Sequence, residues 1–413
     1  MTLVAAGCTI ESKGPAGAPG APAGPSVRAE APGVTADSIK IGIAYPDFAA
    51  IKAFVNIDHG DFEATYRALI DKINADGGVQ GRKLVPVFAK TNLISPAAAQ
   101  ETCVKLTQEE KVFAVLYAAP GNQQAACYLQ NGRTAVIGGP MGAGMYAQAR
   151  APWFSFIGED AAGRAVETFA ARGDLADRKV AVGGVVNDQA QIEQIVLPAL
   201  KAAGVTPVAT GYIAANASDP AAFAQQAGVL FQKAQTAGAD TLLSVGAGAQ
   251  LIPQYLEKTA WRPRQLFTAL PDGYLTTKGE HDFSTLKDAV GATQVTDFAD
   301  PALTACADTV TKADPTLTGK LVDPATVPSG RPTPGASMAT ACRTLALFAA
   351  ITDKAGRNLD HATFQQAGFD LGTFHVPGFR EPATYRRETP SGAIPIRAMV
   401  YDATANRFVP AAN

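Results

Sequence analysis

Apolar residues along the chain follow two alternating patterns. Short runs rich in β-branched residues, such as 39–45 and 83–89, alternate with longer segments in which apolar residues recur every three or four positions, such as 61–75. The first pattern is typical of buried strands and the second of amphipathic helices. Because Gly77 and Gly78 end the helix just before the second run, the pattern predicts a βαβ unit.

The same alternation continues and then restarts near residue 154. In the first half we expect strands at 39–45, 83–89, 112–118 and 134–138, and helices at 61–75, 95–110 and 122–129. In the second half we expect strands at 179–186, 208–213, 241–245 and 265–270, and helices at 189–203, 219–237 and 250–259. Alternation of this kind predicts an α/β fold with parallel sheets and helices on both faces. Two similar halves imply two lobes with a cleft between them.

The last third of the chain departs from this regular order. Here we expect a helix at 301–313, an irregular Pro-rich stretch at 315–335, a long helix at 336–355, and a closing hairpin formed by 394–401 and 407–410. The full length of 413 residues exceeds what one hydrophobic core usually organises. Two domains are therefore the first expectation.

Composition narrows the class of protein. Apolar residues make up 47% of the chain, charged residues 17%, and the formal net charge is only -2. Nucleic-acid-binding proteins carry a basic stripe or patch, so we expect no nucleic-acid partner. No apolar run reaches the roughly 18–20 residues that span a bilayer, so we expect the mature chain to be soluble.

The N-terminal segment carries a possible anchor. The residues before Cys8, Leu-Val-Ala-Ala-Gly, resemble the lipobox of bacterial lipoproteins, in which the cysteine becomes lipid-modified. A chance cysteine in an alanine-rich leader is the alternative, since a basic n-region is absent and the h-region is very short. Residues 9–35 are rich in Gly, Ala, Pro and Ser, a composition typical of a flexible tether. We therefore assign 1–36 as lipobox and tether.

Four further cysteines fall into two close pairs. Cys103 and Cys127 lie on the helices predicted on either side of strand 112–118, and Cys306 and Cys342 lie on two later helices. An even number in an exported protein favours the disulfides Cys103–Cys127 and Cys306–Cys342, although the sequence allows three connectivities and buried free thiols are the alternative. No C-x-x-C spacing indicates a zinc or redox site, and we expect no metal.

One stretch points to a known family. Residues 64–84, Ala-Thr-Tyr-Arg-Ala-Leu-Ile-Asp-Lys-Ile-Asn-Ala-Asp-Gly-Gly-Val-Gln-Gly-Arg-Lys-Leu, resemble the signature region of type I periplasmic binding proteins, the leucine/isoleucine/valine-binding group of ABC-transporter receptors. The resemblance implies two Rossmann-like lobes joined by a three-strand hinge. It assigns residues 37–153 plus 276–388 to the first lobe and 154–275 plus 389–413 to the second.

The resemblance also implies a function and a location. We expect an extracytoplasmic, lipid-anchored, monomeric receptor without a cofactor. It would capture a small polar ligand (an amino acid, an amide or a carboxylate) between its lobes and deliver it to an ABC permease. A ligand sensor on the same fold, not coupled to transport, is the alternative.

Candidate site residues come from the predicted strand ends. In open parallel sheets, ligands bind beyond the carboxyl ends of the strands. The residues that follow these ends, and that we interpret as ligand-binding, are Tyr45, Asp47, Phe48, Tyr117, Ala119, Gly121, Asn122, Gln123, Pro140, Met141, Asp188, Gly246 and Asp272.

Two of these positions are the main candidates. Residues 119–123 form a glycine turn before a helix, where free backbone N–H groups suit a carboxylate. The resemblance places the ligand carboxylate at this turn, usually with a hydroxyl side chain, where this chain has Asn122 and Gln123. Asp272 matches the position at which amino-acid-binding members place an acid against the ligand's ammonium group. An ordinary strand-to-helix turn and a turn-forming Asp-Gly are the respective alternatives.

The enzyme alternatives are weaker. The run Gly246-Ala-Gly248-Ala-Gln-Leu251 approximates a dinucleotide fingerprint, but Leu251 stands where the third glycine is needed. The sequence contains no G-x-x-x-x-G-K-[ST], H-E-x-x-H or G-x-S-x-G motif. The loop at 46–60 is longer than a usual βα connection and is predicted to shape or cover the pocket.

Overall fold

We analysed a computed structural model of the chain. It describes residues 27–411, apart from 53–55, 94, 120–124, 159, 216–218 and 329. The predicted lipidation site Cys8, most of the tether, and the candidate site residues Gly121, Asn122 and Gln123 lie outside the described residues.

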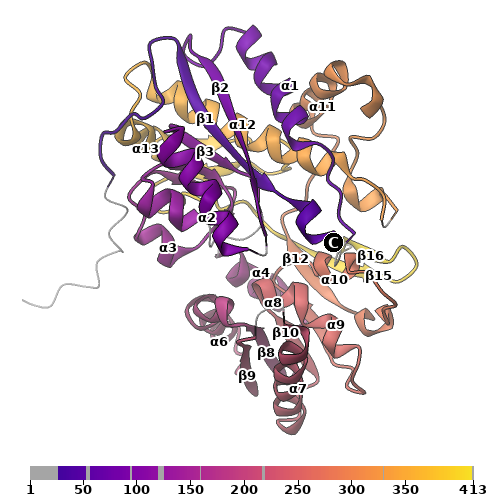
Figure 1. The fold of residues 1–413 in the computed structure, drawn as a ribbon. Helices are drawn as coiled ribbons and strands as arrows, with labels where there is room; N and C mark the ends of the chain where they lie inside the picture. Colours follow the sequence, from indigo (N-terminus) through magenta and orange to yellow (C-terminus); the bar gives the residue numbers. More distant parts are fainter. Residues whose placement is uncertain are drawn as a thin grey trace, which may run out of the picture.

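A parallel sheet forms the centre of the first lobe, the upper lobe in Figure 1. Its strand order is β2-β1-β3-β4-β6, and every neighbouring pair is parallel. The strands are β1 (Ser38–Pro46), β2 (Lys83–Thr91), β3 (Ala114–Tyr117), β4 (Ala135–Gly138) and β6 (Trp153–Phe154). Two small sheets lie beside it, β5 (Pro140–Met141) with β7 (Ile157–Gly158), and β13 (Gly372–Phe374) with β14 (Ala383–Tyr385).

A larger, mixed sheet forms the second lobe. Its order is β16-β15-β12-β11-β10-β8-β9, with parallel pairing from β9 to β12 and antiparallel pairing in the closing hairpin. The strands are β8 (Val180–Val185), β9 (Ala209–Ile213), β10 (Thr241–Ser244), β11 (Arg264–Phe267), β12 (Val290–Thr293), β15 (Arg397–Asp402) and β16 (Arg407–Pro410). The two sheets confirm the predicted α/β class.

Helices begin where the sequence supplies a cap. Asp61, Ser95, Asp219 and Asp300 each accept a hydrogen bond from a first-turn N–H, and a proline opens three of these four helices. The first-lobe helices are α1 (Phe62–Ala75), α2 (Pro96–Val104), α3 (Ala143–Ala147), α11 (Pro301–Ala313), α12 (Pro334–Ala355) and α13 (His361–Phe369). The second-lobe helices are α4 (Asp160–Ala171), α5 (Gln189–Gln191), α6 (Leu197–Ala202), α7 (Pro220–Thr236), α8 (Gly246–Leu251), α9 (Pro253–Leu256) and α10 (Asp272–Thr276).

The chain passes between the lobes three times. The linkers run from β6 to α4, from β12 to α11, and from β14 to β15. One boundary differs from the prediction, which returned the chain to the first lobe at residue 276. Instead, β12 pairs with β11 and β15 in the second sheet, so the second lobe continues to Thr293. This four-residue strand, with a central glycine, follows a long irregular segment, and its local pattern is too short to predict.

The interior of the first lobe is built around α12. This helix packs against α1, α11 and α13, and buries Met338, Leu345 and Phe348 among its many core residues. Among the described residues it is the one helix long and apolar enough to cross a membrane, but 67% of its most apolar window is buried in the protein. It is therefore the core helix of the lobe. The predicted disulfides Cys103–Cys127 and Cys306–Cys342 are both formed, and both lie in this lobe.

Candidate functional site

The carboxyl ends of the strands of both sheets face the region between the lobes. In Figure 1, α8 and α10 follow β10 and β11 at the top of the second lobe, next to the first lobe. The long loop after β1 reaches across this region. The Asn56 N–H donates to the Thr276 carbonyl O at 3.1 Å, and Lys278 Nζ donates to the Lys52 carbonyl O at 2.6 Å. The β1–α1 loop therefore connects the two lobes away from the linkers.

Tyr45 and Phe48 line the first-lobe side of this loop. The Tyr45 ring stacks on Phe62 with 5.7 Å between centroids, and its hydroxyl donates to Glu63. Burial, reinforced by Glu63, raises the pKa of Tyr45 far above its usual value, so the phenol stays neutral. Phe48 packs edge-on against His59 at 4.7 Å. Both rings therefore pack against other residues of the first lobe.

The candidate residues after β3 and β4 are mostly buried. Tyr117, Ala119 and Met141 are each no more than 5% exposed and belong to one apolar cluster. The Tyr117 ring packs edge-on against Tyr128, with 6.0 Å between centroids. Pro140 and Met141 form β5, which pairs with β7 in the first linker.

Asp188 and Gly246 lie next to each other, and the Asp188 side chain is in direct contact with the start of α8. The Asp188 carboxylate accepts hydrogen bonds from the N–H groups of Val185 at 3.0 Å, Ala247 at 3.0 Å and Gly248 at 2.9 Å. Burial raises the pKa of Asp188, and the three N–H donors act in the opposite direction. This side chain therefore occupies the N-terminus of α8 as an internal anion.

This arrangement also bears on the dinucleotide-like motif. The sequence predicts a helix from residue 250, whereas α8 already begins at Gly246. Two of the first backbone N–H groups, which a phosphate would need, are bound to Asp188 instead. The glycines serve this contact, since a Cβ at Gly246 would lie 2.4 Å from the Asp188 carboxylate.

Asp272 is the main candidate residue of the second lobe. It is the first residue of α10 and is exposed, yet desolvation by the surrounding protein raises the pKa of its carboxyl. No described residue donates a hydrogen bond to this carboxylate. Because Asp272 is exposed, its carboxylate keeps its hydration and can pair with a cation that reaches it.

Gln250 holds Asp272 in place, although the sequence analysis did not single it out. Its side-chain Oε1 accepts from the Gly273 N–H at 2.6 Å, and its Nε2 donates to the Leu270 carbonyl O. The amide of this α8 residue thus fixes the turn into α10. A glutamine on a helix carries no distinctive pattern, so no sequence signal could have identified it.

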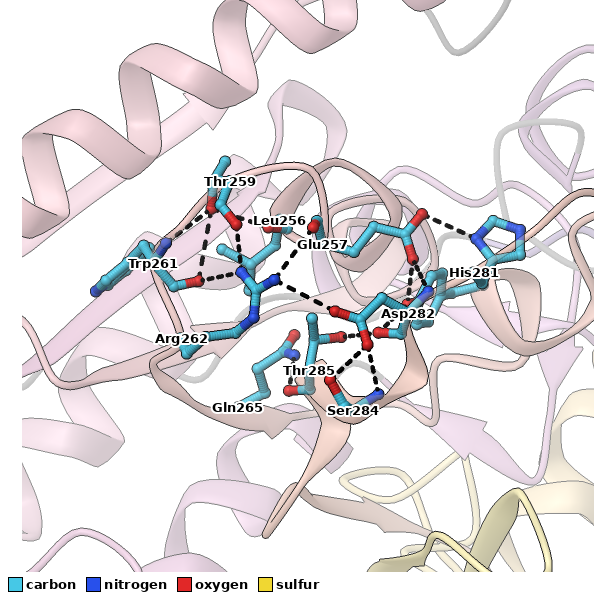
Figure 2. Close-up of polar contacts among 11 residues, drawn as sticks. Leu256, Glu257, Thr259, Trp261, Arg262, Gln265, His281, Asp282, Ser284 and Thr285 are labelled. Atoms are coloured by element: carbon cyan, nitrogen blue, oxygen red, sulfur yellow. Dashed lines mark hydrogen bonds and ion pairs between the residues drawn. The ribbon is translucent and has the colours of Figure 1, made fainter.

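A second set of polar contacts, which the sequence did not predict, holds α10 and the segment that follows it. Glu257 Oε1 lies 2.9 Å from His281 Nδ1, while its Oε2 accepts from the Tyr274 hydroxyl at 2.7 Å and from the Asp282 N–H at 2.9 Å. Figure 2 shows Glu257, His281 and Asp282 in one connected network, with Arg262 bound to Asp282. These residues lie too far apart in the sequence to suggest a cluster.

One cavity adjoins the predicted site in the first lobe. It encloses about 400 Å³ beside the carboxyl ends of β1 and β2, and Asp47 lines it. The other lining residues are Ala89, Lys90, Asn92, Ala98, Glu101, Thr102 and Lys105. The described residues contain no group of three or more His, Cys, Asp or Glu side chains that could hold a metal ion.

The chain resembles known binding proteins over almost its whole length. A periplasmic binding protein family model matches residues 38–404. An ABC transporter substrate-binding protein from Desulfitobacterium hafniense in complex with Leu has a TM-score of 0.60 and 16% identity, covering 91% of this chain and 100% of that one. A fatty acid ABC transporter substrate-binding protein from Thermomonospora curvata has a TM-score of 0.62 and 15% identity, covering 92% and 93%.

A further structure is similar at the same level. A periplasmic binding protein type 1 from Bordetella pertussis Tohama I has a TM-score of 0.64 and 15% identity, covering 91% of this chain and 100% of that one. No curated protein matches the chain. At these identities the solved structures show the fold alone, whereas the family match covers most of the chain. The chain belongs to the type I periplasmic binding protein family.

Proposed function

We propose that the chain captures a small polar ligand with a cationic amine, such as an amino acid or an amino amide, between its lobes and delivers it to an ABC permease. The observation that carries this proposal is the Asp272 carboxylate, which is exposed at the lobe-facing start of α10 and accepts no hydrogen bond from a described residue. An ammonium group there would supply the missing counter-charge.

In this proposal the first lobe binds the opposite end of the ligand. The stretch 119–123, of which only Ala119 is a described residue, follows β3, and the backbone N–H groups of the glycine turn expected there would suit a carboxylate or amide oxygen. A ligand held by both lobes favours the closed form through its higher affinity for that form. Asp188 has a positioning role, because its oxygens already bind the backbone of α8.

Location and anchoring complete the proposal. Proteins of this family act outside the cytoplasm, and the segment before Cys8 supports lipid attachment to the cell membrane. The Gly- and Pro-rich residues that follow would act as the tether between anchor and receptor. Mass spectrometry of the protein from membranes tests the attachment, since an unmodified Cys8 in the mature protein contradicts it.

The test of the ligand is a binding screen with matched variants. We expect thermal shifts with some amino acids or amino amides, and Asp272→Asn to weaken the best of them about ten- to a hundredfold, the range expected for a lost charged hydrogen bond. Glu280→Gln removes an exposed acid from the same segment and is the control. An unchanged affinity in Asp272→Asn removes this residue from the site.

A second measurement separates a receptor from an enzyme. The best ligand is incubated with the protein and the mixture is analysed by mass spectrometry. We expect the ligand to be recovered unchanged in a one-to-one complex. Any product that depends on the protein contradicts the receptor function.

A further inference from the structure

One buried arginine fixes two of the three linkers to the first lobe. Arg343 of α12 donates from Nε to the Pro377 carbonyl O at 2.9 Å and from Nη2 to Thr296 Oγ1 at 2.7 Å. Its guanidinium also lies 4.0 Å from the centroid of the Phe379 ring. Thr296 and Phe379 form an antiparallel bridge between the second and third linkers. These contacts hold the linker residues Thr296, Pro377 and Phe379 against α12 of the first lobe.

A cavity of about 600 Å³ lies where the fixed linkers meet the second lobe. One wall consists of linker residues at 295–298, 379–381 and 394–395, and the other of Thr168 on α4, Arg172 just after that helix, and the β15–β16 hairpin. The residues that line it include none of the candidate ligand-binding residues. The cavity is thus a separate place from the strand ends, and its two walls move relative to each other when the lobes rotate.

The hinge cavity is lined by both apolar and charged residues. We call Phe298, Phe379 and Ile394 its floor, and the charged lining residues Arg172, Asp297, Asp323, Arg380, Glu381 and Arg397 its rim. The rim acids already accept hydrogen bonds within the protein. Asp297 accepts from the Ala299 N–H at 2.9 Å, Asp323 accepts from the Ala325 N–H at 2.9 Å, and Glu381 accepts from Arg397.

Two rim arginines retain free donors. The side chain of Arg380 is 69% exposed, and its closest acid, Asp297, is 3.8 Å away, beyond hydrogen-bond distance. Arg172 donates from Nε to Asp174 at 3.0 Å, and its two Nη groups have no partner among the described residues. Guanidinium groups with free donors bind carboxylates strongly, often through two parallel hydrogen bonds.

We propose that the hinge cavity is an effector site for a small organic anion with an apolar body, the class to which aromatic carboxylates belong. The anion would bind Arg172 and Arg380, which lie on opposite walls, and its apolar part would cover the floor. A ligand that contacts both walls stabilises the hinge angle at which they fit it, and so changes the balance between open and closed lobes.

Benzoate is the probe for this site, and isothermal titration of the full chain measures its binding without any transport ligand. We expect binding to the wild type, at least tenfold weaker binding to the double variant Arg172→Gln/Arg380→Gln, and unchanged binding to Arg178→Gln, an exposed arginine of the second lobe outside the cavity. Inorganic phosphate lacks the apolar body and should bind more weakly. No benzoate binding, equal binding to the double variant, or stronger binding of phosphate overturns the proposed site.

Small-angle X-ray scattering tests the coupling to the hinge. Saturating benzoate should change the radius of gyration of the wild type and leave that of the double variant unchanged. Benzoate binding without a change in the scattering curve overturns the effector role. Because the transport ligand is absent from both experiments, their failure leaves the proposed receptor function untouched.

Discussion

The two lobes share a chain topology but are held together by different means. Both disulfides lie in the first lobe, where Cys103–Cys127 joins α2 to the helical segment after β3, and Cys306–Cys342 joins α11 to α12. The described second lobe contains no cysteine. It buries three acidic side chains inside its own structure, whereas the described part of the first lobe buries one, Asp300 at the start of α11.

Three acids show the pattern in the second lobe. Asp174 lies between Arg264 at 2.6 Å and Arg172 at 3.0 Å, Asp188 holds the start of α8, and Glu257 holds the segment below α10. All three are less than 9% exposed at the residue or side-chain level. A disulfide restricts the unfolded chain, whereas a buried acid acts through native contacts. The first lobe should therefore respond to reductant and the second to single polar substitutions.

Removal of the disulfides should produce the largest effect. For the loops closed by Cys103–Cys127 and Cys306–Cys342, the chain-entropy model gives about 3–4 kcal/mol of stability each. By this model the four-serine variant should lower the unfolding free energy of the first lobe by about 6–8 kcal/mol. Hydrogen exchange with mass spectrometry should show faster exchange in α2, α11 and α12. Equal loss of protection in α7 of the second lobe would contradict the division between the lobes.

The substitution Asp188→Ala should destabilise the second lobe by about 2–4 kcal/mol. It leaves the N–H groups of Val185, Ala247 and Gly248 without their acceptor, and an unsatisfied buried donor costs roughly 1–3 kcal/mol. Hydrogen exchange should quicken in α8 first. Asp71→Ala, at an exposed position of α1, is the control and should change stability very little. Unchanged exchange in α8 would show that Asp188 does not hold the helix.

Much of the fold could be predicted because its signals are local. Helix periodicity, caps such as Ser95 followed by Pro96, and β-branched runs all act within a few residues. The favoured disulfides were also confirmed, Cys103–Cys127 from two helices on either side of one strand and Cys306–Cys342 from two later helices, although the sequence alone allowed three connectivities. The role of Asp188 could not be predicted, because an acid at a strand end looks the same whether it faces the ligand or a neighbouring helix. That outcome depends on the path of the short 3₁₀ turn Val186–Asp188.

The substitution Asp174→Asn should have a smaller effect. It weakens the ion pairs with Arg264 and Arg172 but keeps the shape of the side chain and part of its hydrogen bonding. Because both arginines are partly exposed, we expect a loss of about 1–2 kcal/mol. The measurement is urea unfolding at low and high salt. A loss that is the same at 1 M salt would mean that packing, and not charge, is what Asp174 contributes.

The pH dependence of stability should show whether the Asp272 carboxyl destabilises the folded protein. Desolvation raises the folded-state pKa of this carboxyl, so the folded protein binds a proton more readily than the unfolded chain does. Apo stability should therefore fall as pH rises from the usual aspartate pKa through the raised one, and this step should vanish in Asp272→Asn. At neutral pH the variant should melt at a slightly higher temperature than the wild type, while losing affinity for amine ligands.

The same titration should affect binding with the opposite sign. A protonated Asp272 cannot pair with an ammonium group, so affinity for amine ligands should weaken as pH falls through the raised pKa. Glu280→Gln, the control from the same segment, should keep both pH dependences of the wild type. If the pH dependence of binding survives in Asp272→Asn, the titrating group lies elsewhere, and Asp272 does not pair with the ligand's ammonium group.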